Sequence, residues 1–218
     1  MNIKLKDIDA VKFNGIDIGA VKFNGKYVWR KGSVIVLNHS AGTFKASAEG
    51  TGLKWKYKEQ EVTSSSCNFT IDESDDNVYL LFDKELSKFT CNSDNNLLLD
   101  LADLGGKITN YLSLYGCKNI TGDLSDLGGK ITDYLNLYGC KNITGIYSGQ
   151  SYPKTINLSN TGLSASDMDS TLINFANSSV ANGTFTANNM TRTSASDEAV
   201  STLKARGWKI TGLSKVEA

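Results

Sequence analysis

The nine residues LYGCKNITG occur at 114–122 and again at 137–145, so the two copies are 23 residues apart. The ten residues that begin at Asp100 also recur from Asp123 with a single difference, Ala102 against Ser125. One coil of chain cannot bury its own apolar face, but a stack of copies places each leucine over its equivalent. A catalytic site needs its parts once, whereas a stack of coils needs them repeatedly. The repeat therefore predicts stacked coils.

The repeat continues outside the two copies as short apolar pairs of the form L-x-L. The pairs begin at Phe89, Leu112, Leu135, Ile156, Phe185 and Trp208. A period of about 20–29 residues built on L-x-L is typical of a leucine-rich solenoid with a parallel sheet. Because Phe185 and Trp208 are again 23 residues apart, we expect them to be equivalent, with Trp208 and Ile210 in the terminal strand.

The N-terminal part carries a second, shorter repeat. AVKFNG occurs at 10–15 and at 20–25, and its alternating apolar residues followed by Asn-Gly predict strands joined by tight turns. Residues 1–31 are therefore expected to form a hairpin or meander too small to bury a core alone. We expect this β segment to attach to another protein through its apolar side chains: Val11, Phe13, Val21, Phe23 and Trp29.

Residues 33–86 contain β-rich runs that recur about every 10–12 residues and are separated by Gly, Ser, Asn and Asp. The runs are SVIVLN, GTFKASA, LKWKYKE, CNFTID and NVYLLF. Their spacing predicts a small β-sandwich-like module or partial barrel.

Helical patterns occur only near the C-terminus. Ser164–Asp167 and Ser194–Asp197 have the same sequence, SASD, and each precedes an apolar run, which predicts a helix that starts with a capping box. Arg206-Gly207 predicts the end of the second helix.

The expected fold is therefore mostly β, within the α+β class. It consists of an N-terminal β attachment segment (1–31), a small β-sandwich-like module (33–86) and a short leucine-rich-repeat solenoid (87–218). The solenoid has a parallel sheet, and helices are expected only in its last two coils.

The string YLNLYGCKNITG resembles the leucine-rich repeat, close to the cysteine-containing variety with its L-x-L-x-x-C-x-x-I-T pattern. The resemblance covers about residues 89–213, although the coils are few and no disulfide cap is recognisable. It implies a recognition scaffold, which binds rather than catalyses.

Both ends of the chain carry a second resemblance. AVKFNGIDIGAVKFNGKYVW is similar to the strand-rich starts of tail-associated and other structural proteins of phages. TSASDEAVSTLKARGWKIT is similar to the ends of repeat proteins from gut Bacteroidetes and their phages. Together they imply a structural protein of a phage particle.

Charge and hydropathy exclude some partners. The 23 basic and 23 acidic residues give no net field that would recruit nucleic acid or an anionic membrane. No apolar run reaches the roughly 18 residues of a membrane span, and the first residues lack the apolar core of a signal peptide. We expect a chain folded in a cytosol, with reduced cysteines. For Cys117 and Cys140, a stacked buried ladder is favoured over a metal or redox pair.

Catalytic and metal patterns are weak. The lone histidine, His39, is interpreted as a loop residue, and no G-x-S-x-G motif occurs. The repeated Asp100/Asp123 and Asp103/Asp126 follow the coil register, so a role in turns is favoured over a glycosidase pair. The Gly-Gly doublets at 105–106 and 128–129 are read as tight corners. We therefore expect no enzyme activity and no cofactor.

One acidic segment has the alternate spacing of a calcium loop. It contains Asp72, Ser74 and Asp76, but Asn77 and Asp83 replace the usual glycine and glutamate. A solvated hairpin turn is favoured over calcium, and no metal site is predicted.

The strongest candidate for function is a surface. In an L-x-L strand the leucines point inward, so the flanking residues face the concave side of the solenoid. The candidate binding residues are Tyr111, Ser113, Tyr115, Tyr134, Asn136 and Tyr138. Aromatic rings with small polar groups between them suit a sugar or a protein partner. The alternative is that the stacked tyrosines only shield the sheet.

The two resemblances, together with the small N-terminal segment, imply a non-enzymatic virion protein, made in the host cytoplasm, that displays a recognition module. Its N-terminus would bind other virion proteins, and its repeats a host surface glycan or protein, without nucleic acid or membrane insertion; a homo-oligomer is left open. The alternative is a bacterial cell-surface or secreted adhesin. A glycan-active enzyme is a distant third.

Overall fold

The computed structural model describes residues 11–13, 16–18, 20–23, 26–30, 33–73 and 76–217. Strands account for 44% and helices for 18%, so the fold is mostly β, as predicted. Two mixed sheets, neither of them closed, contain the strands from β5 onward.

The N-terminal strands form two separate hairpins. β1 (Val11–Phe13) pairs antiparallel with β2 (Ile16–Ile18), and β3 (Ala20–Phe23) pairs antiparallel with β4 (Lys26–Arg30). Of the two forms expected, hairpin and meander, the hairpin is confirmed. The side chains of the proposed attachment residues lie outside the described part of the structure; these residues are Val11, Phe13, Val21, Phe23 and Trp29.

The next strands confirm the five predicted β-rich runs and add one short strand. They are β5 (Ser33–His39), β6 (Gly42–Gly50), β7 (Lys54–Tyr57), β8 (Gln60–Val62), β9 (Ser66–Ile71) and β10 (Asp76–Phe82). Strands β5, β7, β8 and β10 lie in one sheet, whereas β6 and β9 lie in the other. Alternate residues, such as Ile35, Leu37 and Phe44, are fully buried in the core.

From β11 to β17 the chain alternates between the two sheets, and β17, β18 and β19 then all lie in the eight-stranded sheet. The strands are β11 (Leu86–Thr90), β12 (Leu97–Asp100), β13 (Ile108–Ser113), β14 (Ile120–Asp123), β15 (Tyr134–Asn136), β16 (Asn142–Thr144), β17 (Thr155–Asn157), β18 (Thr184–Arg192) and β19 (Lys209–Lys215). The helical segments are the 3₁₀ turns η2 (Leu101–Leu104), η3 (Leu124–Leu127) and η4 (Ser194–Ser196), and the helices α1 (Ala165–Asn177) and α2 (Asp197–Ala205). Among the residues that the structure describes, α-helices occur only in the last two coils, as predicted.

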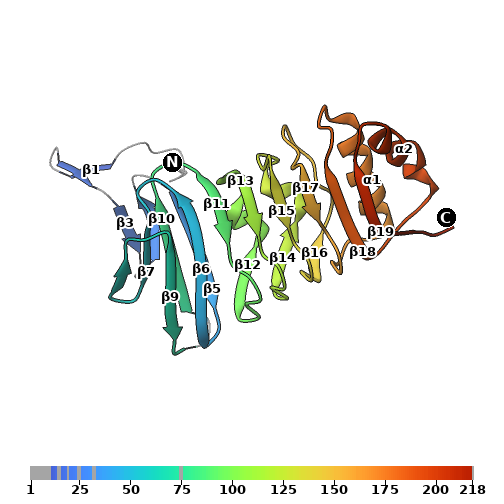
Figure 1. Cartoon of the computed structure of the whole chain (residues 1–218). Helices are drawn as coiled ribbons and strands as arrows, with labels where there is room; N and C mark the ends of the chain where they lie inside the picture. Colours follow the sequence, from blue (N-terminus) through green and yellow to red (C-terminus); the bar gives the residue numbers. More distant parts are fainter. Residues whose placement is uncertain are drawn as a thin grey trace, which may run out of the picture.

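Both sheets are continuous across residue 86. The eight-stranded sheet has the order β19-β18-β17-β15-β13-β11-β6-β9, and the seven-stranded sheet has the order β16-β14-β12-β5-β10-β7-β8. β6 pairs antiparallel with β11, and β5 pairs antiparallel with β12. Figure 1 shows the result, an elongated molecule with the β module at one end and the helices at the other. The division at 86/87 stays a prediction.

The predicted coil register is confirmed in the repeats. Leu112 on β13 lies beside Leu135 on the parallel strand β15, and Phe89 lies beside Leu112. Leu135 also pairs with Ile156, and Ile156 with Phe185. Because all of these side chains are fully buried, the core is a continuous apolar ladder.

The register predicted for the last strand is wrong. Ile210, and not Trp208, lies beside Phe185. Trp208 precedes β19, packs edge-on against Phe175 of α1 with ring centroids 5.5 Å apart, and donates from Nε1 to the Val180 carbonyl at 2.9 Å. The tryptophan fills the space beneath the helix, which an apolar spacing pattern does not distinguish from a strand position.

The corner residues behave as the repeat predicts. Asp100 and Asp123 accept hydrogen bonds from the backbone N–H groups of Ala102 and Ser125, so they cap η2 and η3. Gly128 has a φ of +71° and Gly129 a φ of +56°, in the left-handed region that glycine tolerates best. These residues therefore make coil corners.

The cysteines are buried and free. The Cys117 thiol donates to the Cys91 carbonyl at 3.1 Å, and the Cys140 thiol donates to the Leu114 carbonyl at 3.3 Å. Burial raises the pKa of Cys140, and burial likewise raises the pKa of Cys67, on β9, to about 12. The predicted buried ladder is confirmed for Cys117 and Cys140.

Leu135→Ala should destabilise the protein by about 2–5 kcal/mol, because it opens a cavity in the middle of the ladder. The measurement is urea unfolding followed by circular dichroism. Asp133→Ala, two residues away and exposed, is the control and should change stability by less than about 0.5 kcal/mol. Equal effects of the two substitutions would contradict the ladder.

Candidate binding surface

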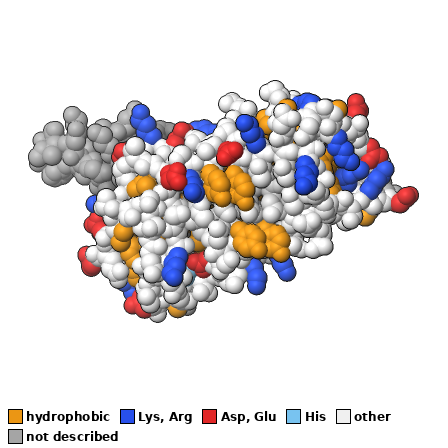
Figure 2. All heavy atoms as spheres, viewed as in Figure 1, with side chains coloured by type: hydrophobic (Ala, Val, Ile, Leu, Met, Phe, Trp, Pro, Cys, Tyr) orange, Lys and Arg blue, Asp and Glu red, His pale blue; other side chains and the backbone are white. Residues whose placement is uncertain are grey.

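Two pairs of stacked tyrosines lie along the eight-stranded sheet: Tyr111 and Tyr134 are on β13 and β15, and Tyr115 and Tyr138 are in the turns that follow these strands. The rings of Tyr111 and Tyr134 are 4.4 Å apart and 11° from parallel, and those of Tyr115 and Tyr138 are 4.7 Å apart and 13° from parallel. These distances match the roughly 4.8 Å between neighbouring strands, so each coil adds one ring. Figure 2 shows two hydrophobic patches over the middle strands. The predicted ladders are confirmed.

The polar residues between the tyrosines are less accessible than predicted. Ser113 is only 3% exposed and donates to Asn92 Oδ1 at 2.8 Å. Asn136 is 8% exposed and donates from Nδ2 to the Tyr134 hydroxyl at 2.9 Å. The expectation that both are exposed is wrong, because both are buried and hydrogen-bonded to neighbouring residues. They hold the tyrosines in place rather than offering free hydrogen-bonding groups.

The two tyrosine pairs differ in their surroundings. Lys88 Nζ lies 5.2 Å from the centre of the Tyr111 ring and 3.2 Å from Glu49 Oε1, so a charge-compensated cation covers that ring. Nothing similar occurs at the second pair: over the described ranges, no lysine or arginine lies on Tyr115 or Tyr138. Tyr115 is 42% exposed, which makes this pair the more accessible one.

A polar hollow of about 380 Å³ adjoins Tyr115. It is lined by Thr43, Lys45, Asn92, Ser93, Asp94, Asn95 and Asn96. The wall and the tyrosine are directly linked, because Asn92 Oδ1 accepts from the Tyr115 N–H at 3.1 Å and the Ser93 N–H donates to the Tyr115 carbonyl at 2.6 Å. The loop that lines the hollow is therefore hydrogen-bonded to the backbone of Tyr115.

A buried hydrogen-bonded pair, His39 and Asp94, supports the loop that lines the hollow. His39 Nε2 lies 3.0 and 3.1 Å from the two carboxylate oxygens of Asp94, and His39 is fully buried. The loop interpretation of His39 is wrong: it is the last residue of β5 and contacts Phe44 edge-on at 5.4 Å. Asp94 also accepts from the Asn96 N–H at 3.0 Å, so the pair fixes the 91–96 loop against the β module.

The neighbouring thiol is unsuited to nucleophilic chemistry. Cys91 Sγ donates to the Lys45 carbonyl at 3.4 Å and lies 3.9 Å from Asp94 Oδ2. A hydrogen bond with Cys117, together with burial and the Asp94 charge, raises the Cys91 pKa. A nucleophile needs the thiolate, so a raised pKa argues against that role.

The acidic segment at 72–76 is occupied by a lysine. Lys58 Nζ lies 2.8 Å from Asp72 Oδ1 and 3.6 Å from Asp76 Oδ2, and the Lys58 and Tyr57 hydrogen bonds lower the Asp72 pKa to about 2. Ser74 lies outside the described residues. The segment joins β9 of one sheet to β10 of the other, so it is not the predicted hairpin turn. The described residues contain no group of three or more His, Cys, Asp or Glu arranged to hold a metal.

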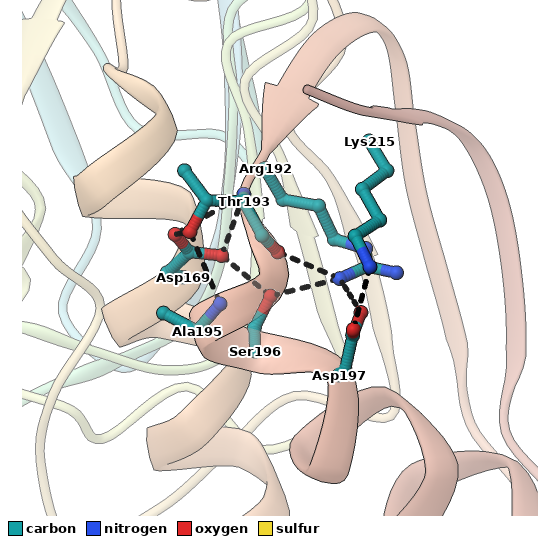
Figure 3. Close-up of polar contacts among 7 residues, drawn as sticks. All are labelled: Asp169, Arg192, Thr193, Ala195, Ser196, Asp197 and Lys215. Atoms are coloured by element: carbon teal, nitrogen blue, oxygen red, sulfur yellow. Dashed lines mark hydrogen bonds and ion pairs between the residues drawn. The ribbon is translucent and has the colours of Figure 1, made fainter. Parts of the chain in front are cut away.

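A second polar cluster joins the last two coils (Figure 3). Asp169 of α1 accepts from the Thr193 hydroxyl at 2.7 Å and from the Ser196 hydroxyl. Arg192 and Lys215 each lie 2.6 Å from the Asp197 carboxylate, and both lower its pKa, Lys215 most. All of these groups are used in packing α2 onto the coil before it.

The same cluster explains why one predicted capping box is wrong. Ser164 and Asp167 form the expected box at the start of α1. At the second SASD, Asp197 binds Arg192 and Lys215 instead, and the Thr193 hydroxyl accepts from the Ala195 N–H. The segment Ser194–Ser196 becomes a 3₁₀ turn, and α2 begins at Asp197.

Sequence reasoning missed the basic residues beside the second tyrosine pair. Lys118 and Lys141 lie three residues after Tyr115 and Tyr138, in exposed turns. The signal was available, because the repeated LYGCKNITG string repeats the lysine together with the tyrosine.

No protein-family model, curated protein or solved structure matches the chain. Within the described ranges, no helix is both long and apolar enough to cross a membrane.

Asp94→Ala should cost about 3–5 kcal/mol of stability, because it leaves the buried His39 without its partner. Chemical unfolding measures the cost, and the double variant His39→Phe/Asp94→Ala tests the coupling. We expect the double variant to be more stable than Asp94→Ala alone. Additive losses would show that the two side chains do not act as a pair.

Proposed function

We propose that the chain is a non-enzymatic recognition module of the leucine-rich-repeat type. Its stacked coils form a short solenoid, and its partner docks on the outer face of the eight-stranded sheet. The observation that supports this most directly is the pair of tyrosine stacks on that face. Tyrosine is enriched at binding hot spots because it offers a large rigid surface at low entropic cost.

The support around the rings favours binding over simple shielding. Asn92, Ser113 and Asn136 hydrogen-bond to one another or to the tyrosine backbone and hydroxyl groups, so the rings are held before any partner arrives. Preorganised groups lose less entropy on association. Tyr115 is nevertheless 42% exposed, so its ring does not contribute fully to the core.

The titratable groups support a non-enzymatic role. The His39–Asp94 pair links two segments that are distant in sequence. The Arg192–Asp197 pair anchors the start of α2. Lys58 neutralises the acidic segment at 72–76. Each of these groups therefore has a structural partner and leaves little for acid–base chemistry.

We further propose that residues 1–31 attach the module to a larger particle, and we favour a phage virion on the resemblance of both chain ends. Strands β1–β4 pair only among themselves in the described structure and extend neither large sheet. Such small hairpins need a neighbour to bury apolar surface. A bacterial surface adhesin remains the alternative function.

The double variant Tyr115→Ser/Tyr138→Ser tests recognition. It should fold normally, because the rings lie outside the core, and it should weaken adsorption to host cells at least roughly tenfold, the equivalent of about 1.4 kcal/mol. Ile173→Ser on α1, where the side chain is 37% exposed, is the control and should adsorb normally. If the double variant folds and adsorbs normally, the tyrosines only shield the sheet and do not bind a partner.

Deletion of residues 1–31 tests attachment. The truncated chain should keep the circular dichroism of the two large sheets but fail to copurify with particles. Normal incorporation of the truncated protein would contradict the attachment role.

A further inference from the structure

The charges on the tyrosine-bearing face are unevenly compensated. Beside the Tyr111–Tyr134 pair, Lys88 pairs with Glu49 at 3.2 Å, and Lys130 pairs with Glu85 at 2.6 Å. At the other end of the strands, Lys45, Lys118 and Lys141 are exposed, and none of them has an ion-pair partner among the described residues. The second tyrosine pair therefore lies at a locally basic edge.

The lysines at this edge are carried on fixed backbone. Asn142 Nδ2 donates to the Lys118 carbonyl at 3.0 Å, and Asn119 Nδ2 donates to the Asn95 carbonyl at 2.6 Å, so each turn is tied to the turn before it. These bonds hold the coil spacing while the ammonium groups remain free. Lys118 and Lys141 therefore repeat at the spacing of one strand, roughly 4.8 Å.

Carboxylates near this edge are already engaged. Asp94 is buried against His39, and Asp72, at the end of β9, is paired with Lys58. Neither carboxylate forms an ion pair with Lys45, Lys118 or Lys141. Charge complementarity favours an anionic partner.

Among the described residues, no lysine or arginine covers the ring faces of the second tyrosine pair. The rings stack along the direction from coil to coil, so the outer face of Tyr115 points toward the coil of Asn92, and that of Tyr138 toward the coil of Ser159. Ser159 is fully buried and accepts from the Asn188 N–H at 2.8 Å. The corresponding outer face of Tyr111 is covered by Lys88.

The composition of the surface favours a carbohydrate over a protein. The hollow beside Tyr115 is lined by amide, hydroxyl and charged side chains, and its volume of about 380 Å³ lies within the range of small-ligand sites. The only large hydrophobic residues that are exposed in the described structure are Tyr115, Ile173 and Val216, so this face has no aliphatic centre. Protein interfaces usually bury such a centre.

The same residues are a poor match for nucleic acid. Proteins that bind single-stranded nucleic acid combine aromatic rings, on which the bases stack, with a strongly basic groove that follows the phosphate backbone. Here the chain has equal numbers of acidic and basic residues, and the uncompensated lysines gather at one edge.

We propose that Tyr115, Tyr138 and the adjoining polar hollow bind an acidic polysaccharide. Sugar rings pack on the tyrosines, Asn92 and its neighbours in the hollow hydrogen-bond to hydroxyl groups, and Lys45, Lys118 and Lys141 pair with the carboxylates or sulfates of the glycan. The proposal rests on the recognition function above and specifies its ligand class.

The test is calorimetric titration of the full chain with defined hexasaccharides. The acidic probes are oligogalacturonate, oligoalginate and a heparin fragment; the neutral probes are cellohexaose and maltohexaose; oligo(dT) is the third class. At least one acidic probe should bind roughly tenfold or more tightly than every neutral probe, and its affinity should fall as salt is added.

Two variants of equal charge change locate the site. Lys45→Gln/Lys118→Gln/Lys141→Gln should lose roughly tenfold or more of the affinity for the acidic probe. Lys154→Gln/Lys204→Gln/Lys209→Gln removes the same charge from exposed lysines elsewhere and should bind like the parent protein. Tyr115→Ser/Tyr138→Ser should also lose binding, whereas Ile173→Ser on α1 should bind like the parent protein.

The outcomes separate this proposal from the recognition function. Equal binding of neutral and acidic probes, tighter binding of oligo(dT), or equal losses in the two lysine variants would overturn the acidic ligand. Absence of binding to every acidic probe would also overturn it. If cell adsorption still depends on Tyr115 and Tyr138 in any of these cases, recognition stands without this ligand; if it does not, both proposals fail.

Discussion

The structure depends on backbone pairing that carries both sheets from the β module into the coils. β6 binds β11 and β5 binds β12 antiparallel, and every later neighbour from β11 to β19 in the eight-stranded sheet is parallel. The β module thus gives the first coil a hydrogen-bonded neighbouring strand in each of the two sheets. Without it, the first coil would leave two rows of unpaired N–H and C=O groups. The apolar ladder can begin at Phe89 because the other edge of β11 is already paired with β6, where Phe89 lies beside Ala48.

The strand register that builds the apolar ladder also sets the positions of the surface tyrosines. Leu112 and Leu135 fix neighbouring strands in register, and the same register stacks Tyr111 on Tyr134 across the outer face. The side chains in between, such as Asn136, are used to hold the rings. At the hollow, the buried His39–Asp94 pair fixes the loop next to Tyr115. The presentation of the tyrosines is therefore a property of the whole stack.

The sequence predicted the contacts between repeated residues correctly. It failed for residues whose contacts occur at a single place in the chain. The pairing of Leu112 with Leu135 and both tyrosine stacks follow from near-identical copies, in which equivalent residues must meet. Trp208 was misplaced because burial beneath a helix and burial in a strand give the same apolar signal. The burial of His39 depends on Asp94, a partner 55 residues away that no local pattern reveals. The second SASD departs from the first because Arg192 and Lys215, outside the motif, bind Asp197.

The near-identity of two adjacent coils has a consequence for how such a molecule can change over generations. Each coil contacts only its neighbours, and the β module and the helical coils complete the two ends. Duplication of the segment 114–136 in the gene would lengthen both tyrosine stacks by one ring and add one lysine to the basic edge, while each end kept its own contacts. Reach along a ligand can then be altered by copying a unit, without the invention of a new surface.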